Sequence, residues 1–184
     1  MGRWAPPEVI ACALSGSERD ADGLIAAIWP ACFRLALMIT GDRGLAEDAA
    51  QEACVIVYRK IRGLRTAAAF DAWLYRIVVR ESARLRRRRG RVTQPEESFI
   101  EDDSGLSVDV WRALAALSDE LREVTVLFYF RDLNCEEIAA ALHVSSGAVR
   151  TRLSRARERL RSLLGNYDFR FDDETRAEVQ VYAI

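Results

Sequence analysis

The chain has 184 residues, of which 50% are hydrophobic and 30% charged, and its formal net charge at pH 7 is -1. This length allows one ordinary domain or two small ones, and the balanced charge argues against a protein that simply coats nucleic acid. The four cysteines show no CxxC spacing and His143 is the only histidine, so we expect no metal site and no cofactor.

Signals for secretion and for membrane insertion are both weak. Residues 6–8 read Pro-Pro-Glu, where a signal peptide would have an apolar run. The longest apolar stretch, residues 24–39, is interrupted by Pro30 and Arg34 and is shorter than the ~20 residues that a membrane helix needs. We therefore expect a cytoplasmic protein without membrane insertion, and the scattered cysteines fit a reducing cytosol.

Apolar residues at helical spacing dominate the first half of the chain. They predict a helix over about 24–39, a second over about 46–61 with Asp42 as its N-cap, and a third over about 70–85. The segment that follows contains Pro95, few apolar residues and five acids, so it cannot bury enough apolar surface to offset its ordering entropy. We interpret it as a flexible acidic linker.

Helical periodicity resumes after the linker and continues to about residue 164. Asn134 and Glu137 have the spacing of a capping box, and Ser145 is placed to cap the last helix. Strand alternation is not seen, so we predict an all-α protein of two small helical domains, the second with a helix-turn-helix. The expected parts are an N-terminal segment 1–20, a first domain 21–90, a linker 91–107, a second domain 108–165 and a tail 166–184.

The sharpest motif is EEIAAALHVSSGAVRTRLSRAR, residues 136–157, which reads as helix, short turn and capped helix. The second helix has a basic and hydroxylic face of the kind that suits the major groove of DNA, where Arg reads guanine edges. The alternative is an arginine-rich, solvated helix in an ordinary bundle. The candidate DNA contacts are Arg150, Thr151, Ser154 and Arg155, flanked by Arg152 and Arg157.

A second basic surface is expected along the helix over about 70–85 and the arginine run behind it. Aromatic residues stand at the start of this helix, and basic side chains beside aromatics suit a surface that follows a DNA backbone and stacks exposed bases. The alternative for Trp73 is that most of its ring belongs to the core. The candidate residues are Trp73, Arg76, Arg80, Arg84, Arg87 and Arg88.

A third feature is an acidic face formed by Asp48, Gln51 and Glu52, which have helical spacing i, i+3, i+4. Taken alone, such a face is most often a solvated one. Paired carboxylates can also serve acid–base catalysis, but no nucleophile, metal cluster or phosphate loop accompanies them in the sequence. We therefore expect a protein that is not an enzyme.

In this order and spacing, the three stretches resemble the extracytoplasmic-function sigma factors of bacterial RNA polymerase. LAEDAAQEA, residues 45–53, is similar to the helix of that family that ends in aspartate, two apolar residues and Gln-Glu. FDAWLYRIVVRESARLRRRR, residues 70–89, is similar to its promoter-melting, minus-ten-reading helix, and residues 114–164 are similar to its minus-thirty-five-reading domain.

The resemblance implies a role for each candidate surface. The acidic face would contact the clamp helices of the largest polymerase subunit, and core RNA polymerase would also be held through its flap. The outward residues of the last helix would read the minus-thirty-five element, the loop 63–69 would capture a flipped minus-ten base, and residues 76–88 would follow the adjoining DNA. The implied partners are core RNA polymerase, promoter DNA and an anti-sigma factor.

His143 stands where the family often has Gly at the turn, and Arg80 where it often has Asn. Histidine tolerates positive φ better than most residues, so we expect the turn to be kept. One alternative is a stand-alone helix-turn-helix regulator that binds DNA without polymerase, which leaves the acidic face without a purpose. Another is an interaction module whose arginine surfaces bind only an acidic regulator.

Overall fold

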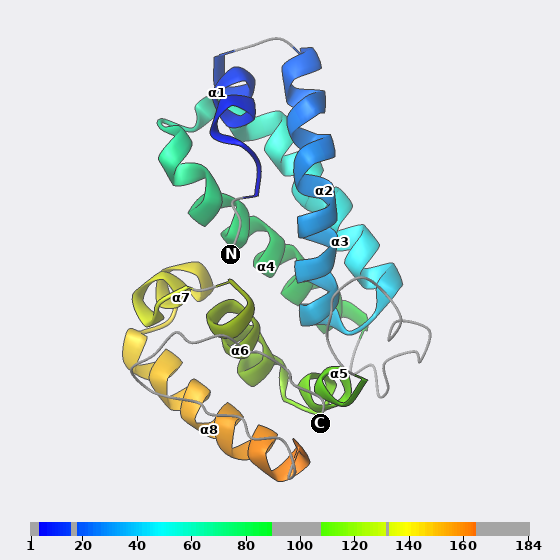
Figure 1. Ribbon diagram of the computed structural model, residues 1–184, viewed down its shortest axis with the longest axis vertical. Coiled ribbons are helices and arrows are strands. Elements are labelled where there is room, and N and C mark those ends of the chain that lie inside the picture. The colour runs from blue at the N-terminus through cyan, green and yellow to red at the C-terminus, as the bar shows by residue number, and fades with distance from the viewer. Residues whose placement is uncertain (1–3, 16–17, 90–107, 132, 165–184) are drawn as a thin grey trace. The chain divides into compact units, whose positions relative to one another are not determined.

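The computed structural model describes residues 4–15, 18–89, 108–131 and 133–164 (Figure 1). Every regular element in these ranges is a helix, which confirms the predicted all-α class. The chain divides into two compact units, one within residues 1–92 and the other within 93–184. The expected linker 91–107 and the tail 166–184 lie outside the described residues.

The first unit is built on three long helices that pack against one another, with a short helix added at its N-terminal side. The second, third and fourth helices are in mutual contact, and the first helix contacts the second and both 3-10 turns. Its elements are α1 (Pro7–Ser15), α2 (Glu18–Thr40), α3 (Arg43–Lys60), the 3-10 turns η1 (Ile61–Gly63) and η2 (Ala67–Ala69), and α4 (Phe70–Arg89).

Local sequence explains where α3 begins and which side it buries. Asp42 has extended backbone angles, and its side chain accepts a hydrogen bond of 2.8 Å from the amide of Leu45, which confirms the predicted N-cap. Small side chains, among them Ala46, Ala50 and Ala53, are fully buried along one face. Because these side chains are short, α3 can lie close to both α2 and α4.

The α2 helix is longer than the apolar stretch that the sequence suggested, and it runs through Pro30. By length and composition alone, Arg19–Thr40 could cross a membrane, because these 22 residues include a window with a mean hydropathy of 1.7. In this structure half of that window is buried inside the protein, including Leu24 and Ile28, which are fully buried. A core helix passes the same test, and its place in the core accounts for the hydropathy of α2.

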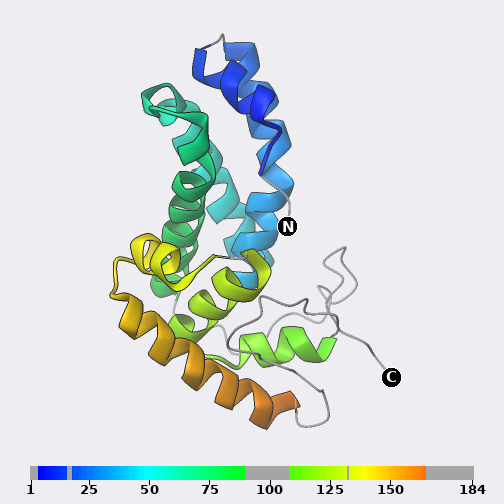
Figure 2. The ribbon, with the colours of Figure 1, turned by 60° about the vertical axis from the view of Figure 1, so that its left-hand side comes forward.

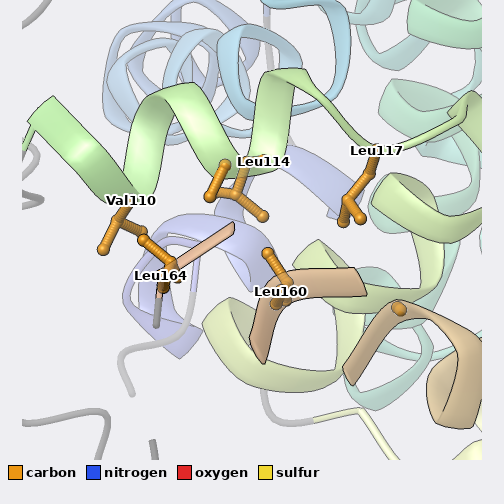
Figure 3. Packing of buried hydrophobic residues seen from close by; sticks show 7 residues of the cluster. Val110, Leu114, Leu117, Leu160 and Leu164 are labelled. Atoms are coloured by element: carbon orange, nitrogen blue, oxygen red, sulfur yellow. The ribbon is translucent and has the colours of Figure 1, made fainter. Parts of the chain in front are cut away.

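The described part of the second unit, residues 108–131 and 133–164, consists of four helices, of which the last contacts all the others. Figure 3 shows a hydrophobic cluster of this unit, in which Val110 and Leu114 of its first helix and Leu117 just after that helix meet Leu160 and Leu164 of its last helix. Burying each large aliphatic side chain contributes about 1.5–3 kcal/mol, so this cluster holds the last helix in place. The helices are α5 (Val108–Ala115), α6 (Asp119–Arg131), α7 (Cys135–Leu142) and α8 (Ser146–Leu164).

The α7–α8 pair forms the predicted helix-turn-helix (Figure 2). Asn134 and Glu137 exchange both hydrogen bonds of a capping box, at 2.9 and 2.8 Å. His143 ends α7 in the left-handed conformation, with φ 55° and ψ 44°, so the turn is kept as expected. Ser145 then accepts a bond of 3.1 Å from the amide of Ala148, which confirms it as the cap of α8.

Arg122 stabilises the C-terminal end of α5. Although charged, it is buried, and its Nε donates a hydrogen bond of 2.7 Å to the carbonyl oxygen of Leu114. Its Nη2 donates to the carbonyl oxygens of Ala115 and Leu117. A cation at this end satisfies carbonyl groups that have no partner within the helix and complements the helix dipole.

Candidate nucleic-acid and polymerase interfaces

The outer side of α8, which we call the α8 face, consists of Arg150, Thr151, Ser154 and Arg155, and all four side chains are exposed. The opposite side of the helix is buried in the core of the second unit, where Leu153 lies. Because apolar residues occupy the buried side of α8, its basic and hydroxyl side chains lie together on the exposed side.

Two of these side chains are partly ordered by neighbours. Arg150 lies 3.5 Å from a carboxylate oxygen of Glu136 and donates to the hydroxyl of Ser146 at 3.3 Å. Thr151 donates to the carbonyl oxygen of Gly147 at 3.0 Å. The Arg150–Glu136 pair is exposed on both sides, so it contributes little to stability and can be exchanged for another acceptor at low cost.

The two arginines predicted to flank the α8 face hold α8 to α6. Arg152, only 22% exposed, forms an ion pair of 3.0 Å with Glu120. Arg157 donates from its Nε to the hydroxyl of Tyr129 at 2.8 Å, and its guanidinium lies 5.7 Å from the ring centre of Phe128. Contact of these two arginines with DNA stays a prediction, and each has a contact within the protein that sequence reasoning missed.

The start of α4 combines an apolar anchor with exposed cations. Phe70 is fully buried, and Trp73, whose ring centre lies 6.1 Å from that of Phe70, is half-buried, so part of the Trp73 ring belongs to the core. Arg76 is exposed, and its Nε donates to the carbonyl oxygen of Ala72 at 3.3 Å. Arg80 is also exposed, with 72% of its side chain accessible.

Glu81 is a buried acid in the middle of this basic stretch. Its carboxylate lies 2.6 Å from the Nε of Arg84 and 3.4 Å from the Nε of Arg80. Arg84 is the more covered of the two cations, with 32% of its side chain exposed. The buried carboxylate therefore fixes Arg84 and draws Arg80 toward the same side of α4.

The arginine run 86–89 consists of one buried and three exposed side chains. Arg86 is buried and donates to the carbonyl oxygens of Ile39 and Thr40 at the end of α2. Arg87, Arg88 and Arg89 are exposed, and Arg89 lies 3.0 Å from the Asp42 carboxylate.

From the sequence alone, all four arginines are expected to form one basic run. The missed signal is helical periodicity, because residue 86 follows the buried Ser82 and Val79 at intervals of four and seven.

The acidic face has the exposure that a docking surface requires. Asp48, Gln51 and Glu52 are all exposed on α3, and the opposite side of the helix is its buried alanine face. Arg43 and Glu47 form an exposed pair of 2.8 Å on the first turn of the same helix. The structure thus brings the three predicted residues together on one solvent-facing surface.

The cysteines and acids of the described ranges form no group of three or more that could hold a metal ion. Cys32 and Cys54, both buried, come together between α2 and α3, and the hydrogen bond with Cys32 lowers the pKa of Cys54. Burial acts on the same pKa in the opposite direction.

The two units match two parts of one protein family. The family described as Sigma-70 region 2 matches residues 24–92, and the family described as Sigma-70, region 4 matches residues 107–160. The α8 face lies within the second match, and the acidic face and α4 lie within the first. The first match begins inside α2, so α1 lies outside it.

Curated relatives are similar over most of the chain. The chain is 33% identical over 164 residues to the ECF RNA polymerase sigma factor SigM of Mycobacterium tuberculosis, which covers 86% of this chain and 84% of the relative. It is 34% identical over 149 residues to the ECF RNA polymerase sigma factor SigE of Mycolicibacterium smegmatis, covering 73% of this chain and 58% of that longer relative.

Two solved structures have a similar fold. The sigma factor RpoE of Bartonella quintana, solved in complex with the anti-sigma factor NepR, is 28% identical with a TM-score of 0.64, covering 80% of this chain and 98% of that one. CnrH, solved with the cytosolic domain of CnrY, is 27% identical with a TM-score of 0.66, covering 86% and 96%. The chain therefore belongs to the extracytoplasmic-function sigma factors, the transcription initiation factors that direct bacterial RNA polymerase to promoters.

Proposed function

We propose that this sigma factor holds one promoter at two elements, through the α8 face and through α4, while the acidic face of α3 binds the clamp helices of the largest polymerase subunit. The observation that carries the proposal is the outward exposure of Arg150, Thr151, Ser154 and Arg155 on a helix whose other side is core. Had Arg150 and Arg155 pointed inward, α8 would present neither of the guanidinium groups that can read guanine edges.

The α8 face has the chemistry of a major-groove reader. A guanidinium can donate two parallel hydrogen bonds to the O6 and N7 of guanine, and Arg150 and Arg155 are both free of the core. Hydroxyl groups such as those of Thr151 and Ser154 donate to phosphate oxygens and fix the register of the helix on the duplex. Arg152 and Arg157 would then act mainly by keeping α8 at a constant angle to α6.

The α4 surface suits the minus-ten element. Arg76, Arg80, Arg87 and Arg88 face solvent along the helix and can follow the phosphate backbone. The exposed part of Trp73 offers a stacking surface for an unpaired base. Flipping a base costs a few kcal/mol, which these contacts and the polymerase together must offset.

Attachment to polymerase explains how two modest DNA surfaces act together. The acidic face adds a third contact on the same chain, and contacts joined on one scaffold raise each other's effective concentration. The flap of the polymerase would hold the second unit. The reaction itself belongs to polymerase, so this chain acts as a cytoplasmic binding factor and not as an enzyme.

An anti-sigma factor would control this chain. Of the two similar solved structures, RpoE is bound to the anti-sigma factor NepR and CnrH to the cytosolic domain of CnrY, and we extend binding by such a partner to the present chain. Such a partner would compete with polymerase or DNA for the exposed surfaces of the two units.

Run-off transcription from genomic fragments with core RNA polymerase tests the proposal. We expect defined transcripts only when core polymerase and this chain are both present. A gel shift on duplex promoter DNA without polymerase separates the stand-alone regulator, which would bind tightly by itself. Tight binding without polymerase, together with no transcript in its presence, would overturn the proposal.

A further inference from the structure

The N-terminal segment of the first unit, residues 4–15, is packed into the domain although it lies before the family match at 24–92. Trp4 is 4% exposed, and Ile10 and Ala13 of α1 are also buried. This segment lies outside the family match, and its apolar side chains are nevertheless buried in the domain. Such burial indicates a structural task, and the question is which part of the domain the segment supports.

The contacts of α1 answer this question. Besides α2, α1 lies against η1, which ends at the first residue of the loop 63–69, and against η2, which forms the last three residues of that loop (Figure 1). This loop is the one to which the family resemblance assigns capture of a flipped minus-ten base. The α1 helix is therefore next to a DNA-reading loop and not at a neutral part of the surface.

The loop has few means of fixing its own shape. Gly63, Arg65, Thr66 and Ala68 are exposed, so its side chains form little core. Two short-range backbone bonds brace its ends, from the amide of Leu64 to Ile61 at 3.0 Å and from the amide of Ala69 to Thr66 at 3.2 Å. A loop of this kind depends on the elements beside it for a single conformation.

Trp4 fastens the segment to α4. Its ring centre lies 4.8 Å from that of Tyr75, at an interplanar angle of 58°, and both rings are buried. Offset and tilted ring pairs at this separation attract beyond the area that they bury. Tyr75 belongs to the second turn of α4, the helix that follows η2, so the segment bridges α4 and the turns at the two ends of the loop.

We propose that residues 4–15 position the loop 63–69 for capture of a minus-ten base, with Trp4 as the positioning residue. The inference rests on the proposed function, since that assigns the loop to DNA. A loop that is already held in its binding conformation loses less conformational entropy when DNA binds. The segment therefore raises affinity and base discrimination without contacting DNA.

The test compares full-length Trp4→Ala, Trp4→Leu and Trp4→Phe with the parent chain. Trp4→Leu keeps an apolar side chain without the ring contact, and Trp4→Phe restores a ring. The control is Ile39→Ala, a buried change at the opposite end of α4, where Arg86 binds the Ile39 carbonyl. Hydrogen exchange of the Leu64 and Ala69 amides is measured in the free chain.

Binding is measured with each variant bound to core polymerase. The probe is the single-stranded minus-ten DNA of a promoter found by run-off transcription, either intact or with one abasic site. In Trp4→Ala and Trp4→Leu we expect loop exchange about tenfold faster and discrimination between the two probes about three- to tenfold weaker. We expect Trp4→Phe and Ile39→Ala to keep both properties.

Parent-like exchange and discrimination in Trp4→Ala and Trp4→Leu would overturn the inference alone. Equal losses in Ile39→Ala would do the same, because they would reflect general destabilisation. If the parent holoenzyme itself did not distinguish the intact from the abasic probe, the proposed minus-ten reading would fail and the inference would fall with it.

Discussion

The Nη1 of Arg86 lies 2.7 Å from the carbonyl oxygen of Ile39. A guanidinium group from the last turn of α4 therefore binds the C-terminal end of α2. A residue from the most basic run of the chain thus stabilises the fold, while its neighbours Arg87 and Arg88 face solvent. The same division recurs in α8, where Arg157 packs on α6 and Arg155 is exposed. Substitutions can distinguish the arginine that stabilises the fold from its exposed neighbour in each helix.

Arg86→Ala is expected to destabilise the first unit by about 2–4 kcal/mol, because buried carbonyl groups lose a charged donor. Arg87→Ala is the matched control, and we expect its stability to stay within about 0.5 kcal/mol of the parent. Thermal unfolding followed by circular dichroism measures both. Equal stability of the two variants would show that the Arg86 contacts do not contribute to the stability of the first unit.

Arg150→Ala and Arg155→Ala are each expected to weaken promoter binding by the holoenzyme by about 1–3 kcal/mol and to relax selectivity at one or two bases. The reason is the loss of a bidentate donor to a base edge. Affinity for the promoter and for a panel of single-base substitutions is measured by fluorescence anisotropy. An equal loss on scrambled DNA would mean that these residues hold phosphate only.

Tyr129→Phe is expected to lower the stability of the second unit by about 0.5–1.5 kcal/mol, since it removes the hydroxyl that accepts from Arg157 and leaves both rings in place. Base selectivity should stay as in the parent, in contrast to Arg155→Ala. Chemical denaturation and the same substitution panel provide the two readouts. A loss of selectivity without a loss of stability would favour a direct DNA role for Arg157.

Asp48→Ala combined with Glu52→Ala is expected to weaken association with core polymerase and to leave the fold unchanged. Both carboxylates are exposed, so their removal costs the free protein little. Glu158→Ala, which removes an exposed acid of α8, is the control. Co-purification with core polymerase and circular dichroism are measured together, and undiminished capture of polymerase by the double variant would contradict the assignment.

His143→Gly is expected to stabilise the helix-turn-helix relative to His143→Ala by about 1 kcal/mol, because a residue with a Cβ is strained at φ 55° and glycine is not. The turn is exposed at this residue, so promoter selectivity should be unaltered. Thermal unfolding of the two variants gives the difference. A His143→Ala variant as stable as His143→Gly would indicate that the left-handed conformation carries no cost here.

Much of the architecture was predictable because its determinants are local. The caps at Asp42, Asn134 and Ser145 each use a side chain within three residues of the amide it binds. Amphipathic periodicity identified the outward side of α8 and the acidic face of α3 for the same reason. A helix exposes one stripe whatever its partner is, so these surfaces follow from the order of the residues.

The tertiary structure decided which arginines are available to DNA and where the N-terminal segment packs. Arg86 binds a carbonyl 47 residues earlier in the chain, and Arg157 binds a hydroxyl 28 residues earlier. Arginine suits a phosphate and a helix C-terminus equally, so composition cannot distinguish the two uses. Trp4 likewise meets Tyr75 only because the folded chain brings them together, and neither the hydrophobicity nor the spacing of these residues specifies that contact.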